Sequence, residues 1–438
     1  MVKRLAILAF FFYPSTIVAL HLKMNKIMAN SNTSLAKENI KIVLLEGIHA
    51  SAEDVFRKDG YQNIFTASKS LPQDELQKEM ADARILGIRS RTQVTAKLLE
   101  CAPKLAAIGC FCIGTNQVDL LAATNKGVPV FNAPFANTRS VAELVLAEII
   151  LLLRGVPAKN AAAHRGEWHK SALNSFETRG KVLGIVGYGH IGTQIGILAE
   201  NLGMKVQFFD VDKKLSLGNA QSADGFTSLL ESSDIVTFHV PETPQTHNMM
   251  NKEAFNQLKK GAILINASRG SVVDIDALVE SLHEGNINGA AIDVFPIEPK
   301  SNQEEFISKL RQFDNVILTP HIGGSTKEAQ INIGIEVSEK LLKYSNNAST
   351  LSSVNFPEVG LPELSDKHRI CHIHHNVPGI LAKINDVLSA TGVNISAQYL
   401  QTNANVGYVV TDVDHAYSQE AITALRQIEG TIRGRILY

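Results

Sequence analysis

Short apolar runs alternate with amphipathic stretches along the first third of the chain. Residues 40–45, 85–88, 105–108 and 128–131 form apolar runs, and a helical pattern over Val118–Asn125, closed by Gly127, lies between two of them. Strands that alternate with helices favour a parallel sheet in an α/β domain. A long apolar helix predicted over Ser140–Arg154 follows, suited to a domain junction or a subunit contact.

A second alternating region begins at Val182. Its six apolar runs span 182–186, 206–209, 235–238, 262–265, 290–292 and 316–318. Six strands separated by helices are typical of a doubly wound nucleotide-binding domain. A helix predicted over Ser325–Tyr344 then returns the chain to the first domain.

The last part of the chain has a different pattern. Residues 346–366 gather Asn, Ser, Pro and Gly and predict a linker. Predicted strands then span 368–374, 393–401, 406–412 and 431–437, with helices over 379–390 and 419–426. This βαββαβ order predicts a ferredoxin-like fold for the C-terminal domain.

Composition limits the class of protein. The chain has 438 residues, 45% of them hydrophobic, and a formal net charge of -1, which argues against general coating of nucleic acid. Its four cysteines include Cys110 and Cys112 but no CxxC pair. We therefore expect buried reduced thiols, no metal site and a cytoplasmic enzyme.

The N-terminus contains a charged and apolar segment. Lys3 and Arg4 precede an apolar run over Leu5–Tyr13, which resembles a signal peptide, but Pro14 interrupts it and no clear A-x-A site follows. We expect residues 1–35 to be a disordered extension or a mis-assigned start, with translation beginning at Met24 or Met28. Export or membrane attachment is the alternative.

A glycine-rich motif lies between the strand over 182–186 and a helix. It contains Gly187, Gly189 and Gly192, and Asp210 ends the next strand about 20 residues downstream. Such glycines allow a tight turn and close approach of the backbone to a pyrophosphate at the helix N-terminus. A carboxylate at Asp210 accepts hydrogen bonds from ribose hydroxyls and repels a 2′-phosphate, so the pattern predicts NAD.

Three further polar residues follow strands of this second region. Arg269, Glu298 and His321 each lie just beyond a predicted strand, where open α/β sheets form their ligand crevice. A histidine removes a hydroxyl proton near neutral pH, a carboxylate stabilises its charged form, and a guanidinium clamps a substrate carboxylate. Each residue alone is typical of a surface, but together they predict oxidation of a 2-hydroxy acid.

Basic residues follow strands of the first region. Arg89, Ser90 and Arg91 follow the strand over 85–88, Asn137 precedes the long helix, and Lys170 lies in the loop after it. Such a group suits a phosphate or a second carboxylate, and a solvated basic face is the alternative.

These motifs resemble the D-isomer-specific 2-hydroxyacid dehydrogenase family from about residue 38 to the end, notably at 86–92, 107–117, 131–140, 187–192, 265–270 and 318–325. The resemblance implies a substrate-binding domain over 36–136 and 324–365, an NAD-binding domain over 137–323 and an ACT domain over 366–438. It implies that Arg269 binds substrate, that Glu298 assists His321, and that His321 transfers the proton. The implied NAD-site residues are Gly187, Gly189, His190, Ile191, Gly192, Asp210, Ala267, Ser268, Arg269, Asp293, His321, Ile322, Gly323 and Gly324.

Members that act on 3-phosphoglycerate imply further roles. Arg89, Ser90, Arg91, Asn137 and Lys170 would hold that substrate. Members are tetramers, in which a residue like Trp168 inserts into a neighbouring nucleotide domain, and some also reduce 2-oxoglutarate. The ACT domain would bind L-serine through His374, Asn376 and Asn394.

One departure from the family concerns the linker. Residues 364–368 replace a glycine pair that often serves as a hinge, which puts the size of any serine-driven motion in doubt. A glycerate or hydroxypyruvate dehydrogenase and a nucleotide-sensing corepressor or scaffold are the alternative functions.

Overall fold

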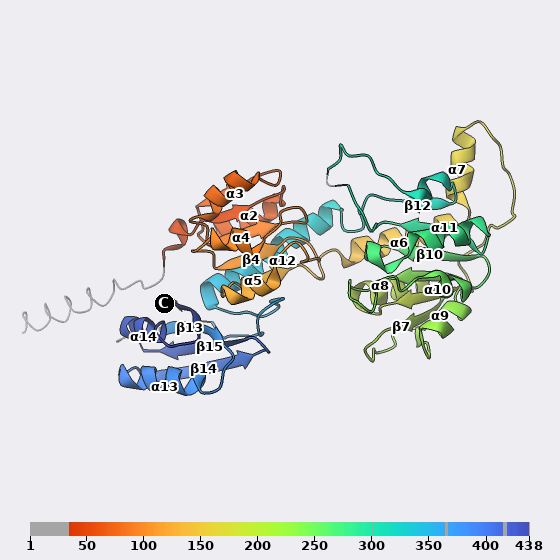
Figure 1. The fold of residues 1–438 in the computed structure, drawn as a ribbon. Helices are drawn as coiled ribbons and strands as arrows, with labels where there is room; N and C mark the ends of the chain where they lie inside the picture. The colour runs from red at the N-terminus through yellow and green to blue at the C-terminus, as the bar shows by residue number, and fades with distance from the viewer. Residues whose placement is uncertain (1–34, 300, 364–366, 415–417, 438) are drawn as a thin grey trace, which may run out of the picture.

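The computed structural model describes residues 35–299, 301–363, 367–414 and 418–437. The apolar N-terminal segment and both proposed start methionines lie outside these residues. Figure 1 shows three sheets, each of which packs against its own set of helices. Helix α12 (Lys327–Asn347) belongs to the first of these units, although the chain reaches it only after completing the second.

The first sheet is parallel and has the order β2-β1-β3-β4-β5. Its strands are β1 (Ile42–Leu44), β2 (Ile64–Thr66), β3 (Ile85–Ile88), β4 (Ala107–Cys110) and β5 (Val130–Asn132). Helices α2 (Ala50–Lys58) and α12 cover one face, and α3 (Gln73–Met80), α4 (Ala96–Glu100) and α5 (Leu120–Asn125) cover the other. Strand β4 begins two residues later than predicted, and the edge strand β2 was not predicted because its side chains are only partly buried.

The second sheet is also parallel and has the order β12-β11-β10-β9-β6-β7-β8. All six predicted strands are present as β6 (Val182–Val186), β7 (Lys205–Phe209), β9 (Ile235–Phe238), β10 (Ala262–Asn266), β11 (Ile287–Ile292) and β12 (Val316–Leu318). The seventh, β8 (Gln221–Ser222), consists of two exposed polar residues and leaves no hydrophobic pattern. The sequence therefore predicted this domain in all but one edge strand.

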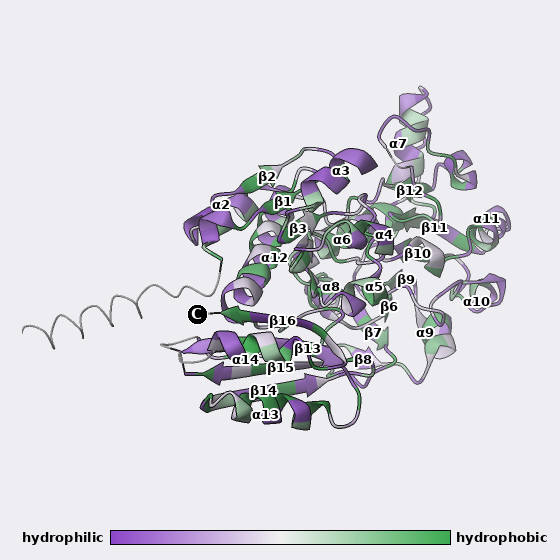
Figure 2. Cartoon of the chain, turned by 60° about the vertical axis from the view of Figure 1, so that its left-hand side comes forward, coloured by the Kyte–Doolittle hydropathy of each residue, from purple (hydrophilic) through white to green (hydrophobic). Residues whose placement is uncertain are grey.

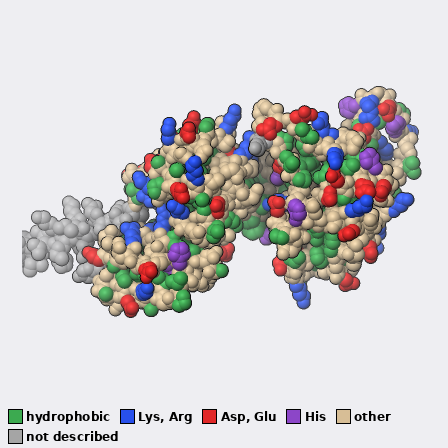
Figure 3. Space-filling model, viewed as in Figure 1, with side chains coloured by type: hydrophobic (Ala, Val, Ile, Leu, Met, Phe, Trp, Pro, Cys, Tyr) green, Lys and Arg blue, Asp and Glu red, His purple; other side chains and the backbone are tan. Residues whose placement is uncertain are grey.

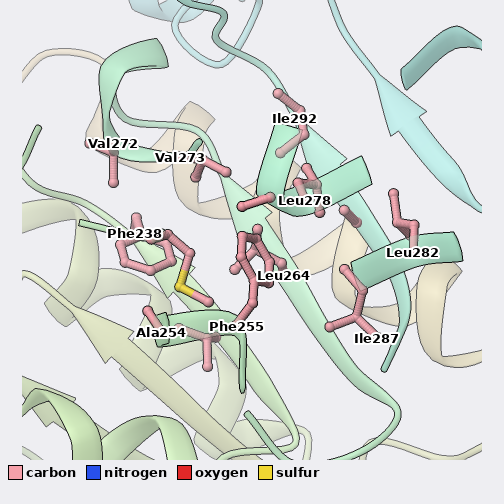
Figure 4. Close-up of a cluster of buried hydrophobic side chains, with 14 of the residues drawn as sticks. Phe238, Ala254, Phe255, Leu264, Val272, Val273, Leu278, Leu282, Ile287 and Ile292 are labelled. Atoms are coloured by element: carbon pink, nitrogen blue, oxygen red, sulfur yellow. The ribbon is translucent and has the colours of Figure 1, made fainter. Parts of the chain in front are cut away.

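Helices bury both faces of the second sheet. Helices α6 (Thr138–Leu153) and α8 (His190–Asn201) pack on one face, and α9 (Phe226–Ser232), α10 (Lys252–Asn256) and α11 (Ile275–His283) pack on the other. Figure 4 shows the second of these cores, in which Leu264 from β10 lies beside Phe255 and Leu278 from the helices. Helix α7 (Val156–His164) projects from the domain (Figure 1).

The third sheet is antiparallel and has the order β14-β15-β13-β16. Its elements are β13 (His368–His375), α13 (Ile380–Ala390), β14 (Ile395–Thr402), β15 (Val406–Val413), α14 (Ser418–Leu425) and β16 (Thr431–Leu437), which confirms the predicted βαββαβ order. Both helices pack on one face of the sheet, and residues of the preceding linker pack on the other. Figure 2 shows hydrophobic and hydrophilic segments next to one another along both helices.

Within the described ranges, no helix combines the length and the apolar character that a membrane crossing requires. Helix α6 is strongly apolar but has only 16 residues, and its buried side chains pack in the core of the second domain.

Candidate active site

The glycine-rich turn connects β6 to α8. Gly187 has a left-handed backbone (φ 91°), and a Cβ there would collide with the carbonyl of His239, the residue that follows the neighbouring strand β9. A Cβ on Gly192 would collide with the carbonyl of Gly187, whereas one on Gly189 would meet nothing within 4 Å. Two of the glycines therefore close the turn, and the third leaves open space before the N-terminus of α8. This cradle fits the pyrophosphate of a dinucleotide.

Asp210 lies beside this turn at the end of β7. One of its carboxylate oxygens accepts a hydrogen bond from the backbone N–H of Tyr188 at 2.8 Å, and the other accepts one from Asp212 at 2.9 Å. These bonds hold the carboxylate next to the glycine turn. Each oxygen keeps acceptor capacity for a ribose hydroxyl, because a carboxylate has about four lone-pair directions.

His321 and Glu298 form a pair on loops that follow β12 and β11. The Nδ1 atom of His321 lies 3.0 and 3.1 Å from the two carboxylate oxygens of Glu298. The backbone N–H of Phe295 donates to the same carboxylate at 3.2 Å. The Nε2 atom of His321 is thus the ring nitrogen that remains for a substrate, on a side chain that is 53% exposed.

Each member of this pair changes the pKa of the other. The hydrogen bond that His321 makes to the carboxylate of Glu298 raises the pKa of His321 above its usual value, against the opposing effect of burial. Burial alone would raise the pKa of Glu298, but the hydrogen bond and charge of His321 lower it. The pair therefore favours an ionised carboxylate beside an imidazole that readily holds a proton.

Arg269 lies in the loop after β10. The amide of Asn266 donates to its backbone carbonyl at 2.9 Å, and its guanidinium donates to the carbonyl of Ser268 at 2.6 Å. The next residue must be small, because a Cβ on Gly270 would collide with the backbone of Phe295 in the loop that leads to Glu298. Local contacts therefore fix the loops of Arg269 and Glu298 against each other.

Asp293 organises the loop that carries His321. Its buried carboxylate accepts hydrogen bonds from the hydroxyl of Thr319 at 2.6 Å and from the backbone of Ile322 at 2.8 Å and Gly323 at 2.9 Å. These bonds hold His321 in a left-handed conformation (φ 54°) that is uncommon for a non-glycine residue. Thr319 was not singled out from the sequence, although it is the residue that follows β12.

The first domain contributes a facing loop after β3. The carboxylate of Glu46 accepts the backbone N–H of Arg91 at 2.9 Å, and the amide of Gln117 donates to the carbonyl of Arg89 at 2.5 Å. Sequence reasoning missed both anchors, because a polar side chain that binds backbone across a sheet leaves no motif.

Two of the predicted arginines approach one another from opposite domains. The charges of Arg89 and of Arg269 both act on the thiol of Cys112, although its burial is the larger effect and raises its pKa to about 11. A guanidinium nitrogen of Arg269 also lies 3.8 Å from the Cβ position of Gly114, in the loop after β4. Arg89 and Arg269 therefore lie at a cleft between the two domains, which Figure 3 shows as a hollow between two lobes.

The other residues predicted to bind substrate lie at different distances from this cleft. Asn137, at the start of α6, packs closely on Gly324 and so lies beside the loop that carries His321. Ser90 is exposed on the loop of Arg89. Lys170 is exposed and belongs to the segment between α7 and β6. Figure 1 shows this segment on the side of the second domain that faces away from the first domain. Trp168 in the same segment is 87% exposed.

The remaining predicted cofactor residues surround the turn and the loops. They are His190 and Ile191 at the start of α8, Ala267 and Ser268 before Arg269, and Ile322 and Gly323 after His321. The ring of His190 lies 4.1 Å from that of Phe135, which comes from the first domain. The described residues contain no cluster of His, Cys, Asp or Glu placed to hold a metal ion.

The three residues predicted to bind L-serine do not meet within one chain. His374 and Asn376 lie where β13 pairs with Val406, the first residue of β15. Asn394 precedes Ile395, which pairs with Val413 at the other end of β15. The Nε2 atom of His374 is buried without a partner, and burial lowers the pKa of this histidine.

The comparisons with known proteins agree with this geometry. Residues 146–323 match the model of the D-isomer specific 2-hydroxyacid dehydrogenase NAD-binding domain, and residues 370–433 match an AHAS small subunit-like ACT domain. The chain is 60% identical over 408 residues to D-3-phosphoglycerate dehydrogenase of Haemophilus influenzae, covering 93% of this chain and 100% of that protein. It is 57% identical over 410 residues to the Escherichia coli K12 enzyme of the same name, with 93% and 100% coverage.

Solved structures show the same two-domain fold. A D-lactate dehydrogenase from Aquifex aeolicus, complexed with NAD and lactic acid, superposes with a TM-score of 0.64 at 25% identity, covering 73% of this chain and all of that one. The TT0316 protein from Thermus thermophilus gives a TM-score of 0.62 at 31% identity, covering 69% and 96%.

Fold, glycine turn and the paired loops define an NAD-dependent oxidoreductase of the D-isomer-specific 2-hydroxyacid dehydrogenase class. Within that class, the chain belongs to the D-3-phosphoglycerate dehydrogenase family, with a C-terminal ACT domain.

Proposed function

We propose that the chain oxidises 3-phospho-D-glycerate to 3-phosphooxypyruvate with NAD, as the first step of L-serine biosynthesis. The observation that carries this proposal is the contact between His321 and Glu298, on the same sheet edge as the glycine turn and opposite the loop of Arg89. It unites a proton acceptor, a dinucleotide cradle and a cationic cleft in one place.

The side chains divide the reaction between them. NAD held at the glycine turn and Asp210 would supply the hydride acceptor for the carbinol carbon of the substrate. His321 takes the hydroxyl proton on Nε2, while Glu298 holds the ring through Nδ1 and stabilises its charged form. Arg269 binds the substrate carboxylate and polarises the oxygen that becomes a carbonyl.

The substrate's phosphate requires a second cationic group. Arg89 and Arg91 supply guanidinium groups at the end of β3, and Ser90 and Asn137 supply polar contacts nearby. Lys170 reaches a substrate only from a neighbouring subunit, because its segment lies on the side of the second domain that faces away from the first domain (Figure 1).

We also propose a homotetramer inhibited by L-serine. The exposed Trp168 suits insertion into a neighbouring nucleotide domain. His374 and Asn376 from one subunit combine with Asn394 of the next across paired ACT domains, since these residues lie at opposite ends of one sheet. The same proposal includes a cytoplasmic location and a side reduction of 2-oxoglutarate. It also includes three domains, with limits of 36–136 together with 324–365, 137–323 and 366–438.

An assay of NADH formation from 3-phosphoglycerate, with glycerate as the competing substrate, tests the activity. We expect His321→Ala to lower kcat by about a hundredfold or more while NAD binding is kept, because the glycine turn is separate. The exposed His247 serves as a matched control through His247→Ala. Equal turnover of glycerate would contradict the phosphate assignment, and turnover indifferent to serine would remove only the regulatory claim.

A further inference from the structure

A cavity of about 620 Å³ lies between the ACT domain and the first domain, away from the active-site cleft. Strand β16 and the end of α14 form one wall, and the starts of β3 and β4 with the end of α12 form the other. Arg84, Arg426, Arg433 and Arg435 all line it, and no carboxylate side chain does. Figure 3 shows basic side chains along this boundary between the domains.

These arginines bind only neutral acceptors. A guanidinium nitrogen of Arg433 donates to the carbonyl of Leu105 at 2.5 Å, and one of Arg435 donates to the carbonyl of Tyr344 at 2.5 Å. The Nε atom of Arg426 donates to the carbonyl of Gly434 at 3.1 Å. Within the described ranges, none of the four arginines takes part in an ion pair.

Some donors in this group are unused. The Nε atom of Arg435 is buried and has no nitrogen or oxygen partner, although the guanidinium interacts with the thiol of Cys371. The side chain of Arg84 donates no hydrogen bond to any described residue, and it is only partly exposed. A guanidinium has five N–H donors, so the group retains several that point to no acceptor.

The positive charges also act on one another. Burial lowers the pKa of Arg433, and the charges of Arg435 and Arg84 lower it further, against the opposing effect of Tyr344. Like charges brought together and partly desolvated are unfavourable unless an opposite charge compensates them. A bound anion would remove this repulsion and use the free donors, because guanidinium groups match phosphate and carboxylate oxygens in pairs.

We propose that this interdomain cavity binds a small multivalent oxyanion, a phosphate ester or a polycarboxylate, clamped between Arg426, Arg433 and Arg435 of the ACT domain and Arg84 of the first domain. The ligand touches both domains, so its binding stabilises the docked arrangement of the ACT domain. The site is separate from the catalytic residues and from the serine residues.

Titration of the full-length protein tests this site. Inorganic phosphate and citrate are added at constant ionic strength, with KCl and acetate as controls, and the rise in Tm and the heat of binding are measured. We expect saturable binding of at least one of the two multivalent anions and none of acetate. Binding of phosphate alone identifies a phosphate ester as the occupant, and binding of citrate identifies a polycarboxylate.

Arg84→Gln and Arg426→Gln locate the anion. Arg426 is exposed and Arg84 is partly exposed, so the fold should be kept. Each change should weaken binding at least about fivefold, as expected for loss of one charge-assisted contact. Lys97→Gln on α4 removes an equal charge from an exposed position and should leave binding unchanged. Turnover of the Arg84→Gln protein without added anion should equal that of the parent.

An active-site variant separates the two anion sites. In Arg89→Gln, the interdomain site is intact, so saturable stabilisation by the anion should persist. The proposal is overturned if neither anion binds, if Lys97→Gln weakens binding as much as Arg84→Gln, or if Arg89→Gln abolishes the binding and Arg84→Gln does not.

Discussion

His321 combines an uncommon backbone conformation with a specific side-chain partner. A left-handed non-glycine residue costs roughly 1–3 kcal/mol and persists only where the surroundings enforce it. Asp293 supplies that enforcement through the backbone of Ile322 and Gly323. The outcome is a ring whose Nδ1 meets Glu298 and whose Nε2 is left for chemistry.

The Glu298→Gln variant tests how this pair works. An amide carries no negative charge and stabilises the imidazolium less than a carboxylate does, so the pKa of His321 should fall from its raised value. Oxidation needs the neutral ring, which is present above that pKa. The acidic limb of the profile of kcat/KM against pH should therefore move to lower pH, while kcat falls about tenfold or more because the ring loses its orientation.

The charge of Asp293 also raises the pKa of His321, but its effect is smaller than that of Glu298, and its carboxylate oxygens accept hydrogen bonds from the loop. The exposed pair of Lys252 and Glu280 offers a control, because Glu280→Gln removes a carboxylate far from the cleft and should leave the pH profile unchanged. An acidic limb that stays in place in Glu298→Gln would show that Glu298 does not set the pKa of His321.

At the scale of elements, strand pairing decides where the residues of the ACT domain can act. His374 on β13 lies directly opposite Gly407 on β15, and a Cβ at Gly407 would collide with the imidazole ring. The absence of a side chain on one strand thus makes room for the ring on the next. A strand position without a side chain commonly marks such a close approach.

Gly407→Ala should displace the His374 ring and so raise the concentration of serine needed for half-inhibition about tenfold or more, with turnover in the absence of serine unchanged. Inhibition assays at several serine concentrations measure this shift. Gly360→Ala is the matched control, because a Cβ there meets nothing within 4 Å. An unaltered midpoint in folded Gly407→Ala protein would remove His374 from the serine site.

At the scale of the whole molecule, the ACT domain is joined to the first domain by buried polar contacts. The hydroxyl of Tyr408 donates to the carbonyl of Ala348, the left-handed residue that ends α12, at 2.7 Å. Arg369 is buried, pairs with Asp412 at 2.6 Å and also donates to residues at the end of α12 and in the linker. These contacts connect the ACT sheet to the helix that completes the first domain.

Tyr408→Phe should lower the free energy of unfolding by about 1–3 kcal/mol, because the buried carbonyl of Ala348 loses its partner. Urea unfolding followed by circular dichroism measures this loss. Tyr399→Phe removes a hydroxyl on the same sheet that has no hydrogen bond within the described ranges, and should cost much less. Equal losses in the two variants would show that the contact with α12 contributes little.

The sequence by itself determined the elements and the chemistry. Hydrophobic periodicity located the strands of the NAD-binding domain except β8, because a half-buried or fully buried strand must alternate or concentrate apolar residues. The glycine spacing predicted the turn. Glycine is required at these positions because the backbone conformation of Gly187 and the packing of Gly192 leave no room for a side chain. The order of strands also placed Arg269, Glu298 and His321 at one sheet edge.

Only the tertiary structure decided which side chains meet. Glu46, Gln117 and Thr319 anchor the site loops, yet each binds a partner distant in sequence and leaves no local pattern. The separation of His374 from Asn394 follows from strand direction, and the arginine-lined cavity exists because β16 docks on the first domain. Local sequence encodes conformation and residue chemistry, whereas contacts between distant segments arise from packing of the complete chain.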